Sequence, residues 1–366
     1  MKTKKQYYNL KQLLSYNADY NLVIGERSNG KTYATLKYCI ERYVKYNEKF
    51  VYIRRWKEDI VGKRGEVIFN AIVQNNVIRD LTKHEYSNTL LQSGKFYLSS
   101  YDDKLKKFIP SEDYFCYLVS LSDMEHDKSL SFTGVKYIVY DEFMTRRYYL
   151  KDEFMLFMNV LSTIIRDRKD IKIFMLGNTV NKYNPYFAEF GINVDNLKQG
   201  SIDLYHYGDS ELTLAVEYCN EGVTNKKESN KYFAFDNPRL NMIKSGAWEL
   251  DIYPHLPPEL KIEKNNILFS FYVLFCEKTI QGDICQIKNN VFIFFHYKTT
   301  EIKDIDKQLI YTLNSNIGIN YRSNLIRGVG NLEKRINMLF AMNKVFYQSN
   351  EIGEIIHNYN LQACNR

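Results

Sequence analysis

The sequence has little that would break or cross-link the chain. Only 6 of its 366 residues are proline and 17 are glycine. The six cysteines include no C-x-x-C pair, and the six histidines show no ligand spacing beside them, which argues against structural zinc and for reduced thiols. The most apolar run, residues 267–276, is about ten residues long and too short to cross a bilayer. We therefore expect no zinc site, no membrane span and no secretion signal.

The composition is that of a globular protein. Hydrophobic residues make up 45% of the chain and aromatic residues 15%, which is ample for a packed interior. The net charge of +7 is mildly basic and favours an anionic partner such as nucleic acid. Because single cores stop growing at roughly 250–300 residues, the length predicts two domains.

The most specific pattern is GERSNGKT at residues 25–32, which matches G-x-x-x-x-G-K-[ST]. The two glycines let the backbone curl so that its N–H groups point at phosphates. Lys31 then reaches the β- and γ-phosphates, and Thr32 holds Mg²⁺. An apolar run precedes the loop and a helical pattern follows it, so a phosphate-binding loop is preferred over a surface glycine loop. The predicted nucleotide contacts of this loop are Gly25, Glu26, Arg27, Ser28, Asn29, Gly30, Lys31 and Thr32.

A second pattern is the apolar stretch at 135–143, which stops at Asp141 and Glu142. A buried parallel strand whose end opens into a site has this form. We predict that Asp141 contacts the nucleotide and, together with Thr32, the Mg²⁺ ion, with Asp141 acting through water. Glu142 is predicted to polarise the attacking water. The Asp-Glu pair is a weak signal alone, but its place more than a hundred residues after the loop, with a strand candidate between, makes it a Walker B motif.

Other polar residues follow predicted strands and helices. Residues 171–178 read as a buried strand ending in Asn178, an amide that could hold the water, the γ-phosphate or Glu142. A helix at 152–165 precedes Arg166 and Arg168, which fit either an arginine finger for a neighbouring subunit or cations at a helix C-terminus. In the segment before the first strand, the candidates for packing on a nucleotide base, or for plain packing, are Tyr8, Gln12 and Tyr16.

Basic residues supply candidate contacts to DNA phosphates. Three lysines lie in the loop at 101–109, after a predicted hairpin at 85–100, and read as a basic prong or as a solvated face. The full set of candidate DNA contacts is Lys57, Lys104, Lys106, Lys107, Arg146 and Arg147.

The predicted division is a nucleotide domain at 1–208, a linker region at 209–262 and a C-terminal domain at 263–366. The linker region is predicted because it contains the polar run at 225–231 and a proline cluster near 254–258. The last domain alternates strands, at 266–276 and 291–297, with a helix at 332–346. Because its first strand carries no acidic residue, we expect no two-metal nuclease.

Together these motifs resemble the DNA-packaging ATPases of small tailed phages whose genomes carry a terminal protein. The resemblance covers about residues 8–187 and rests on LSYNADYNLVIGERSNGKTYA, FVYIRRWK, IVYDEF, IIRDR, GN and NPYF in order. It implies an α/β P-loop NTPase of the additional-strand, conserved-glutamate class. It also implies a smaller α+β C-terminal domain, a ribonuclease H-like fold without cutting activity.

The resemblance further implies roles and partners. Arg166 would be a finger acting between subunits, Lys128 a second basic residue between subunits, and Asn178 the residue that restrains Glu142. Members of this family use ATP and Mg²⁺ to move double-stranded DNA. They act as a pentameric ring on the portal of an empty capsid in the host cytoplasm, and some also need a structural RNA.

Two other functions remain open at this stage. Another ring-forming DNA translocase or helicase would share every site residue. A nucleotide-gated scaffold without turnover is a third possibility, although Glu142 argues against it because a switch that does not hydrolyse ATP has no need of this acid.

Overall fold

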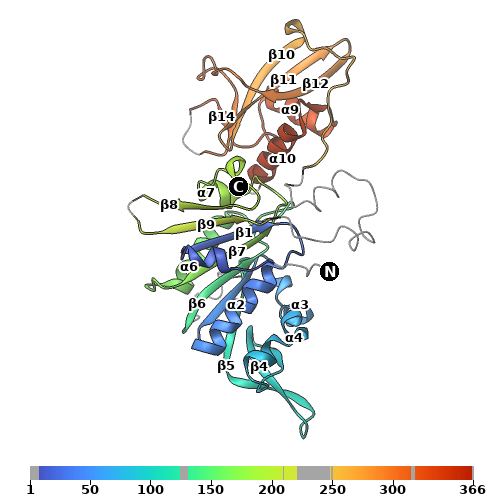
Figure 1. The fold of residues 1–366 in the computed structure, drawn as a ribbon. Coiled ribbons are helices and arrows are strands. Elements are labelled where there is room, and N and C mark those ends of the chain that lie inside the picture. The colour runs from blue at the N-terminus through green and yellow to red at the C-terminus, as the bar shows by residue number, and fades with distance from the viewer. Residues whose placement is uncertain are drawn as a thin grey trace, which may run out of the picture. The chain divides into compact units, whose positions relative to one another are not determined.

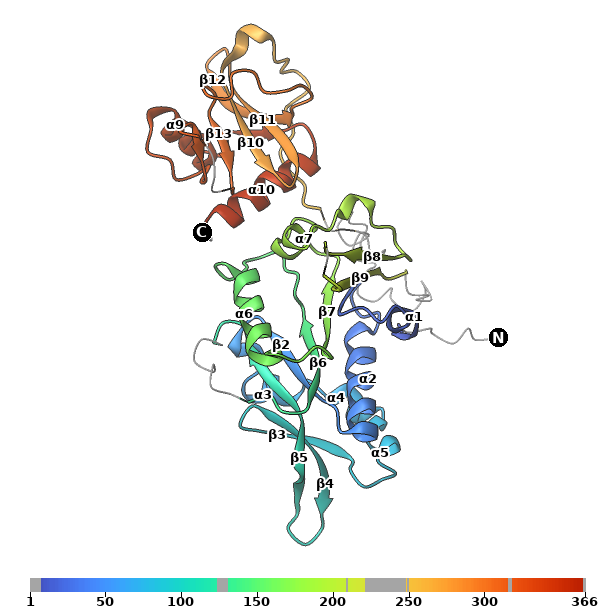
Figure 2. The ribbon, with the colours of Figure 1, turned by 90° about the vertical axis from the view of Figure 1, so that its left-hand side faces the viewer.

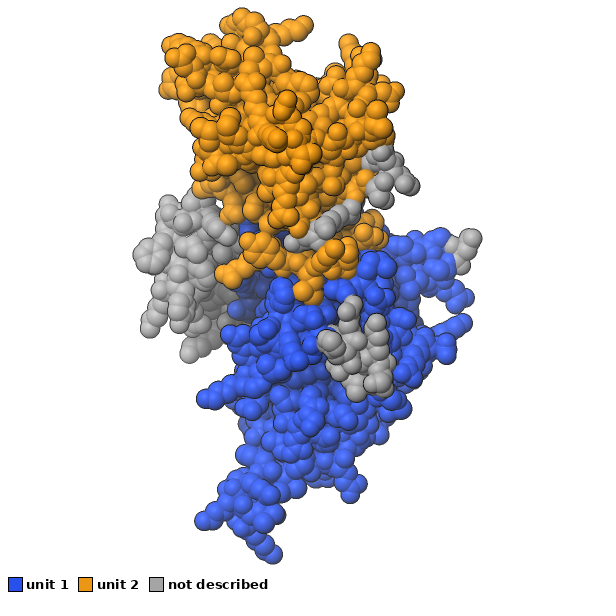
Figure 3. Space-filling model, turned by 180° about the vertical axis from the view of Figure 1, so that it is seen from behind, with its two compact units in different colours: residues 1–146, 153–182, 193–248 blue, residues 147–152, 183–192, 249–366 orange. Residues whose placement is uncertain are grey.

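A computed structural model describes residues 8–123, 131–208, 210–220, 248, 250–314 and 318–364 (Figure 1). The chain divides into two compact units, coloured separately in Figure 3. The first unit holds residues 1–146, 153–182 and 193–248, and the second holds 147–152, 183–192 and 249–366. The six cysteines are free thiols. In the described parts of the chain, no helix is long and apolar enough to cross a membrane.

The described part of the first unit is built on a nine-stranded sheet in the order β3-β4-β5-β2-β6-β7-β1-β9-β8. Its parallel strands are β5 (Lys107–Ser120), β2 (Lys49–Arg54), β6 (Val135–Asp141), β7 (Lys172–Asn178), β1 (Tyr20–Gly25) and β9 (Thr213–Tyr218). Antiparallel strands close both edges, namely β3 (Asn88–Gln92), β4 (Lys95–Asp102) and β8 (Ile202–His206). The predicted hairpin turn is confirmed, since Gln92 pairs with Lys95 across Ser93 and Gly94.

The strand order positions the site. β7 lies between β1 and β6, which is the additional strand of the predicted fold class. Gly25 at the end of β1 is level with Asn178 at the end of β7, and Asp141 at the end of β6 is level with Leu176. Three of the predicted functional segments therefore end at the same edge of the sheet.

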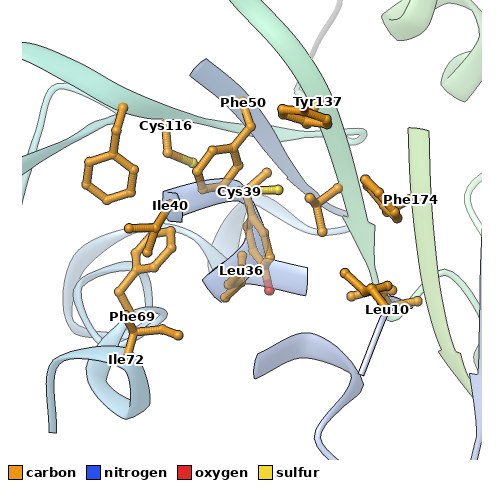
Figure 4. Close-up of a cluster of buried hydrophobic side chains, with 14 of the residues drawn as sticks. Leu10, Leu36, Cys39, Ile40, Phe50, Phe69, Ile72, Cys116, Tyr137 and Phe174 are labelled. Atoms are coloured by element: carbon orange, nitrogen blue, oxygen red, sulfur yellow. The ribbon is translucent and has the colours of Figure 1, made fainter. Parts of the chain in front are cut away.

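Helices cover both faces of this sheet. Figure 2 shows α2 (Lys31–Tyr46) and α6 (Glu153–Ile165) on opposite sides of it. Figure 4 shows the buried side chains of Leu36, Cys39 and Ile40 on α2 among the aromatic rings of the core. The remaining helical elements of the unit are α1 (Lys11–Ser15), α3 (Gly62–Glu66), α4 (Asn70–Gln74), α5 (Val77–Leu81) and single turns at Lys57–Asp59 and Val194–Asn196.

The first unit continues beyond the predicted domain end at 208. Strand β9 lies inside the stretch 209–262 that the sequence suggested as a linker, and it pairs with β1 from Tyr20 opposite Leu214. The difference arises because β9 is a short apolar run between polar stretches, and only its pairing with a distant strand shows it to be part of the core. The polar run at 225–231 lies outside the described residues.

The described part of the second unit has a six-stranded sheet in the order β14-β13-β10-β11-β12-β15. Three antiparallel strands, β10 (Ile267–Phe275), β11 (Lys278–Ile287) and β12 (Asn290–Tyr297), are flanked by β13 (Ile310–Thr312), β14 (Tyr321–Arg322) and β15 (Val345–Tyr347). β13 runs parallel to β10 and β14 runs parallel to β13. A three-stranded meander with two parallel strands beside its first strand is the arrangement of ribonuclease H-like sheets, as predicted.

Helices of the second unit are α7 (Pro185–Glu189), α9 (Asn331–Ala341) and α10 (Asn350–Cys364), with a single turn at Lys264–Asn266. Buried residues of α9 and α10 pack with Phe271, Val273 and Phe295 in one core. The helix predicted at 332–346 is shorter than expected, because the chain leaves α9 at Ala341 and enters β15.

The opposite face of this sheet carries a buried acid with three donors. Asp283 on β11 accepts hydrogen bonds from Ser270 (2.6 Å) and Gln281 (2.8 Å) and lies 3.0 Å from Nε2 of His296. Burial raises the pKa of Asp283, but the hydrogen bonds from His296, Gln281 and Ser270 outweigh it, so that the pKa is lowered. The hydrogen bond to Asp283 raises the pKa of His296. These partners mark Asp283 as a structural residue.

This pair predicts a pH-dependent stability. The histidine contribution is complete below its unfolded pKa of about 6.5 and is lost as pH rises through the higher folded pKa. The aspartate contribution is complete above about 3.9 and is lost as pH falls through the lower folded pKa. Substituting His296→Gln should therefore cost most between about pH 4 and 6.5, roughly 1.5–3 kcal/mol, and less at pH 8. Urea unfolding across pH measures this, with exposed His357→Gln as control; an equal cost at pH 5 and pH 8 would contradict it.

Candidate active site

The phosphate-binding loop joins β1 to α2 in the predicted place. Gly30 has a φ of +95° and Ser28 a φ of +61°, so the backbone makes the left-handed turns that the loop needs. A Cβ atom added at Gly25 would lie 2.8 Å from the Cβ of Cys219, at the end of β9. Glycine at this position is therefore required by the close approach of the neighbouring segment.

Lys31 is buried under the loop, with 5% of its surface exposed. Its ammonium donates to the carbonyl of Glu26 (2.6 Å), the carbonyl of Gly25 (3.3 Å) and the side chain of Asn178 (3.2 Å). Burial lowers the pKa of Lys31, and its charged neighbours only partly offset this. An anionic phosphate that replaced these neutral acceptors would favour the charged lysine.

Thr32 and Asp141 meet as expected of a metal site. The hydroxyl of Thr32 lies 3.1 Å and 3.2 Å from the two carboxylate oxygens of Asp141, which is 6% exposed. Both are oxygen ligands of the kind that Mg²⁺ prefers, and Mg²⁺ is usually held by one or two carboxylates plus substrate phosphates. The residues present therefore fit the ion, which when bound would screen the phosphate charge.

Around these groups lies a cavity of about 350 Å³. It is lined by residues of the loop and of the ends of β6 and β7, namely Arg27, Ser28, Asn29, Gly30, Lys31, Thr32, Tyr33, Asp141, Glu142, Leu176, Gly177 and Asn178. Glu26 contributes its carbonyl oxygen to Lys31. Of the predicted nucleotide contacts, Gly25 and Glu26 do not line the cavity, and their carbonyl oxygens accept hydrogen bonds from the buried Lys31 instead.

Glu142 leaves the strand in an unusual direction. Its φ is +56°, which ends β6 and breaks the alternation that would send its side chain straight to the opposite face. Its carboxylate is 58% exposed and accepts a hydrogen bond of 2.7 Å from Arg54 on the neighbouring strand β2. The predicted catalytic acid therefore lies at the cavity and is paired with Arg54, an ion pair that the sequence did not predict.

Two further side chains of β2 and its end support the acidic pair. The hydroxyl of Tyr52 donates to Asp141 at 2.8 Å. Arg55 is buried and donates to Glu153 (2.7 Å), to the carbonyl of Phe143 (2.6 Å) and to the carbonyl of Glu142 (3.2 Å). One strand end thus positions the side chain of Asp141 and the backbone after it.

We expect Tyr52→Phe to raise the Mg²⁺ concentration needed for half-maximal turnover about tenfold. Losing the ligand-orienting hydrogen bond costs metal affinity by roughly 10–100-fold in comparable sites, whereas the ring still fills its place in the core. Burial raises the pKa of Tyr52, so its hydroxyl stays protonated as a donor. ATPase rates titrated with Mg²⁺ measure the effect. Tyr137→Phe is the matched control, since its hydroxyl donates to Glu48 at the other end of β6 (2.8 Å); equal Mg²⁺ curves for both variants would contradict this role.

The arginines after α6 separate into two roles. Arg168 donates to the carbonyls of Ile165 (3.3 Å) and Val135 (2.9 Å), and also to that of Ile164, so it takes the helix-terminus role. Arg166 is exposed, with a φ of +51°, and follows the end of α6. Because α6 leads from the end of β6 to the start of β7, Arg166 lies at the edge of the sheet remote from its own phosphate cavity. Lys128, the other predicted intersubunit residue, lies outside the described residues.

The predicted DNA contacts lie on several elements. Lys104, Lys106 and Lys107 are exposed at the end of the β4–β5 hairpin, which extends away from the sheet (Figure 2). Lys57 follows β2 and forms an ion pair with Asp123 at 2.6 Å. The guanidinium of Arg146 donates to the carbonyl of Val180 at 3.1 Å, and Arg147 is exposed in the second unit.

A parallel sheet with an additional strand, a phosphate-binding loop and a Walker B acid pair define a P-loop NTPase of the additional-strand, conserved-glutamate class. The model of the Podovirus DNA encapsidation protein family (Gp16) matches residues 2–229, and the chain belongs to this family.

Two curated relatives and two solved structures extend this finding. The DNA packaging protein of Bacillus phage phi29 is 31% identical over 223 residues, which cover 60% of this chain and 59% of that protein. That of Bacillus phage B103 is 32% identical over 268 residues, covering 64% and 76%. The bacteriophage Phi-29 viral genome packaging motor assembly matches with a TM-score of 0.57 and 20% identity over 98% of this chain and 99% of that chain. The Phi-28 gp11 DNA packaging motor gives 0.54 and 20% over 98% of both, so the fold is shared along the chain.

Proposed function

We propose that this protein hydrolyses ATP to drive double-stranded DNA into an empty capsid through the portal, as the repeating subunit of a homopentameric ring. The observation that carries the proposal is the convergence of Lys31, Thr32, Asp141 and Glu142 on one cavity in a member of the encapsidation family. Lys31 would bind the phosphates, and Thr32 and Asp141 would hold Mg²⁺. Glu142 would take the proton of the attacking water.

The scaffold alternative is disfavoured by the same cavity. A protein that binds ATP without turnover gains nothing from a carboxylate in the left-handed backbone conformation of Glu142 beside the metal ligands. Another ring-forming translocase or helicase would have the same site residues. The form of DNA that stimulates turnover and the binding to capsids therefore distinguish these functions from packaging. The test is an ATPase assay with duplex DNA, single-stranded DNA and empty capsids. Stimulation by duplex DNA and capsids together supports packaging, and stimulation by single strands alone supports a helicase.

The proposal also covers the binding partners of the protein and the absence of nuclease activity in its second unit. The other subunits of the ring, the portal and a structural RNA are the proposed partners, and the proposed place of action is the procapsid in the host cytoplasm. We propose that the second unit does not cut DNA. Its first strand, β10, carries no acid, and the carboxylate of Asp283 on β11 is held by Ser270, Gln281 and His296.

DNA binding should depend strongly on salt. A motor that moves any sequence must hold phosphates, which carry no sequence information. If about five contacts form at once, the logarithm of affinity should fall against the logarithm of salt with a slope of roughly −4 to −5, and removing one contact per complex should reduce that slope by about one. Lys104→Ala should therefore reduce the slope by about one for each subunit whose Lys104 contacts the DNA. Fluorescence anisotropy with unrelated duplexes measures this. Lys303→Ala, an exposed lysine of the second unit, is the control, and strong discrimination between duplex sequences would contradict phosphate-based binding.

A further inference from the structure

Arg55 follows β2, the strand beside β6, and its side chain is buried, with 6% of its surface exposed. Each of its three side-chain nitrogen atoms donates a hydrogen bond. Nε donates to a carboxylate oxygen of Glu153 (2.7 Å), Nη1 to the carbonyl of Glu142 (3.2 Å) and Nη2 to the carbonyl of Phe143 (2.6 Å). Arg55 does not line the phosphate cavity, so its effect on the chemistry there must pass through these neighbours.

The backbone of Glu142 and Phe143 is held at each of its four polar groups. The N–H of Glu142 donates to the carboxylate of Asp141 (3.0 Å), and the N–H of Phe143 donates to the carbonyl of Leu176 on β7 (3.2 Å). The two carbonyl groups accept from Arg55. β7 therefore holds this segment from one side and Arg55 holds it from the side of β2, where Glu142 has a φ of +56°. A residue in this conformation persists only where its surroundings fix it.

Glu153, the first residue of α6, fixes Arg55 in turn. None of its side chain is exposed, and one carboxylate oxygen accepts from Arg55 while the other accepts from the hydroxyl of Tyr140 at 2.9 Å. A buried carboxylate is costly unless it is paired and hydrogen-bonded, and this one is both. A lysine would be enough to pair with Glu153, but only the planar fork of an arginine also reaches two carbonyl groups.

From this geometry we propose that Arg55 is a positioning residue for ATP hydrolysis, which fixes the backbone of Glu142 so that its carboxylate is directed at the attacking water. The inference rests on the proposed function, because it takes Glu142 as the acid that activates this water. Arg54 and Arg55 then have different roles, since Arg54 binds the carboxylate of Glu142 (2.7 Å) and Arg55 binds its carbonyl. Misplacing a catalytic group by about 1 Å can cost roughly 10²-fold in rate, which sets the size of the expected effect.

Two variants of the full chain separate positioning from stability. Arg55→Lys keeps a cation beside Glu153 but loses the planar fork, and Arg55→Gln combined with Glu153→Gln leaves no unpaired charge buried. Both should fold, as thermal unfolding measures. Both should bind a slowly hydrolysed ATP analogue within about twofold of the wild type, while turnover with duplex DNA and capsids falls about 10- to 100-fold.

Arg42→Lys is the matched control. Arg42 forms a comparable two-bond ion pair with Glu48 (2.7 and 3.0 Å), but it lies near the C-terminal end of α2, at the opposite end of this helix from the phosphate-binding loop. This variant also loses the planar fork of an arginine, and it should keep wild-type turnover.

A double-mutant comparison tests whether Arg55 acts through Glu142. Adding Arg55→Lys to Glu142→Gln should lower the residual turnover by less than about twofold, because the effects of residues that act as a unit are not additive. A further loss as large as that of Arg55→Lys alone would show that Arg55 acts elsewhere and would overturn the inference.

Each other outcome has a defined meaning. If the variants fold and keep wild-type turnover, or if the analogue binds more weakly in proportion to the lost turnover, the positioning role is wrong while the proposed function stands. Failure of both variants to fold would assign Arg55 to the stability of the fold alone and would also overturn the inference. If the wild-type protein hydrolyses no ATP, the inference fails together with the proposed function.

Discussion

Arg166→Ala should reduce DNA-stimulated ATP turnover by roughly 10³–10⁵-fold while leaving ATP affinity almost unchanged. An arginine that stabilises the charge developing in phosphoryl transfer contributes this much to the rate. Arg166 cannot do so for its own nucleotide, because it lies past the end of α6, and β7 separates it from the phosphate edge by seven residues, about 20 Å of strand. Its side chain is exposed, as contact with a neighbouring subunit of the proposed ring requires. Steady-state kinetics with capsids and DNA measure the loss.

Mixing two inactive proteins tests the intersubunit role. When Arg166→Ala subunits are mixed with Glu142→Gln subunits, some interfaces combine an intact Glu142 with an intact Arg166 from the neighbour, and turnover should partly return. Arg168→Ala is the neighbouring control, since its guanidinium binds helix-end carbonyls and should affect stability more than turnover per folded molecule. No recovery in any mixture would count against a finger acting between subunits.

Glu142→Gln should bind ATP with near wild-type affinity and hydrolyse it roughly 10²–10⁴-fold more slowly, the range for loss of a general base. Lys31→Ala should lose binding itself, because its ammonium sits under the loop within reach of the phosphate cavity. Equilibrium titration with a slowly hydrolysed ATP analogue, followed by single-turnover assays, separates the two effects. Glu112→Gln, an exposed residue of β5, is the control for removing one carboxylate. Wild-type turnover in purified Glu142→Gln would show that another group activates the water.

The central residues of the site could be predicted from the sequence because the polar residues that follow parallel strands all lie at the same edge of the sheet. Gly25, Asp141 and Asn178 each follow an apolar run, so their convergence needs only the class of the sheet. The contacts of Arg54 and Tyr52 could not be predicted in this way. These contacts require that β2 lies directly beside β6, with Tyr52 opposite Val139. The sequence of neither strand shows which distant strand it pairs with. Two signals were available, namely their i, i+2 spacing, which places both on one face, and the position of Arg54 at the end of a predicted strand, where ligands of parallel sheets bind.

The domain boundary was missed for a related reason. A buried strand of six residues, β9, carries too little periodicity to be distinguished from a loop, and its partner β1 lies almost two hundred residues earlier. The structure was also needed to assign different roles to Arg166 and Arg168. Both fit a helix end by sequence, and only the bonds of Arg168 to nearby carbonyls assign that role to one of them.

The backbone of Glu142 carries strain that this protein cannot relieve without losing the carboxylate. A non-glycine residue in the left-handed region costs about 1–2 kcal/mol, and Glu142, with its φ of +56°, carries that cost. Selection for stability alone would replace Glu142 with glycine or asparagine and would relieve the strain at the loss of the carboxylate. Evolution towards a more heat-resistant version must therefore gain its stability elsewhere in the fold and leave this strained position as it is.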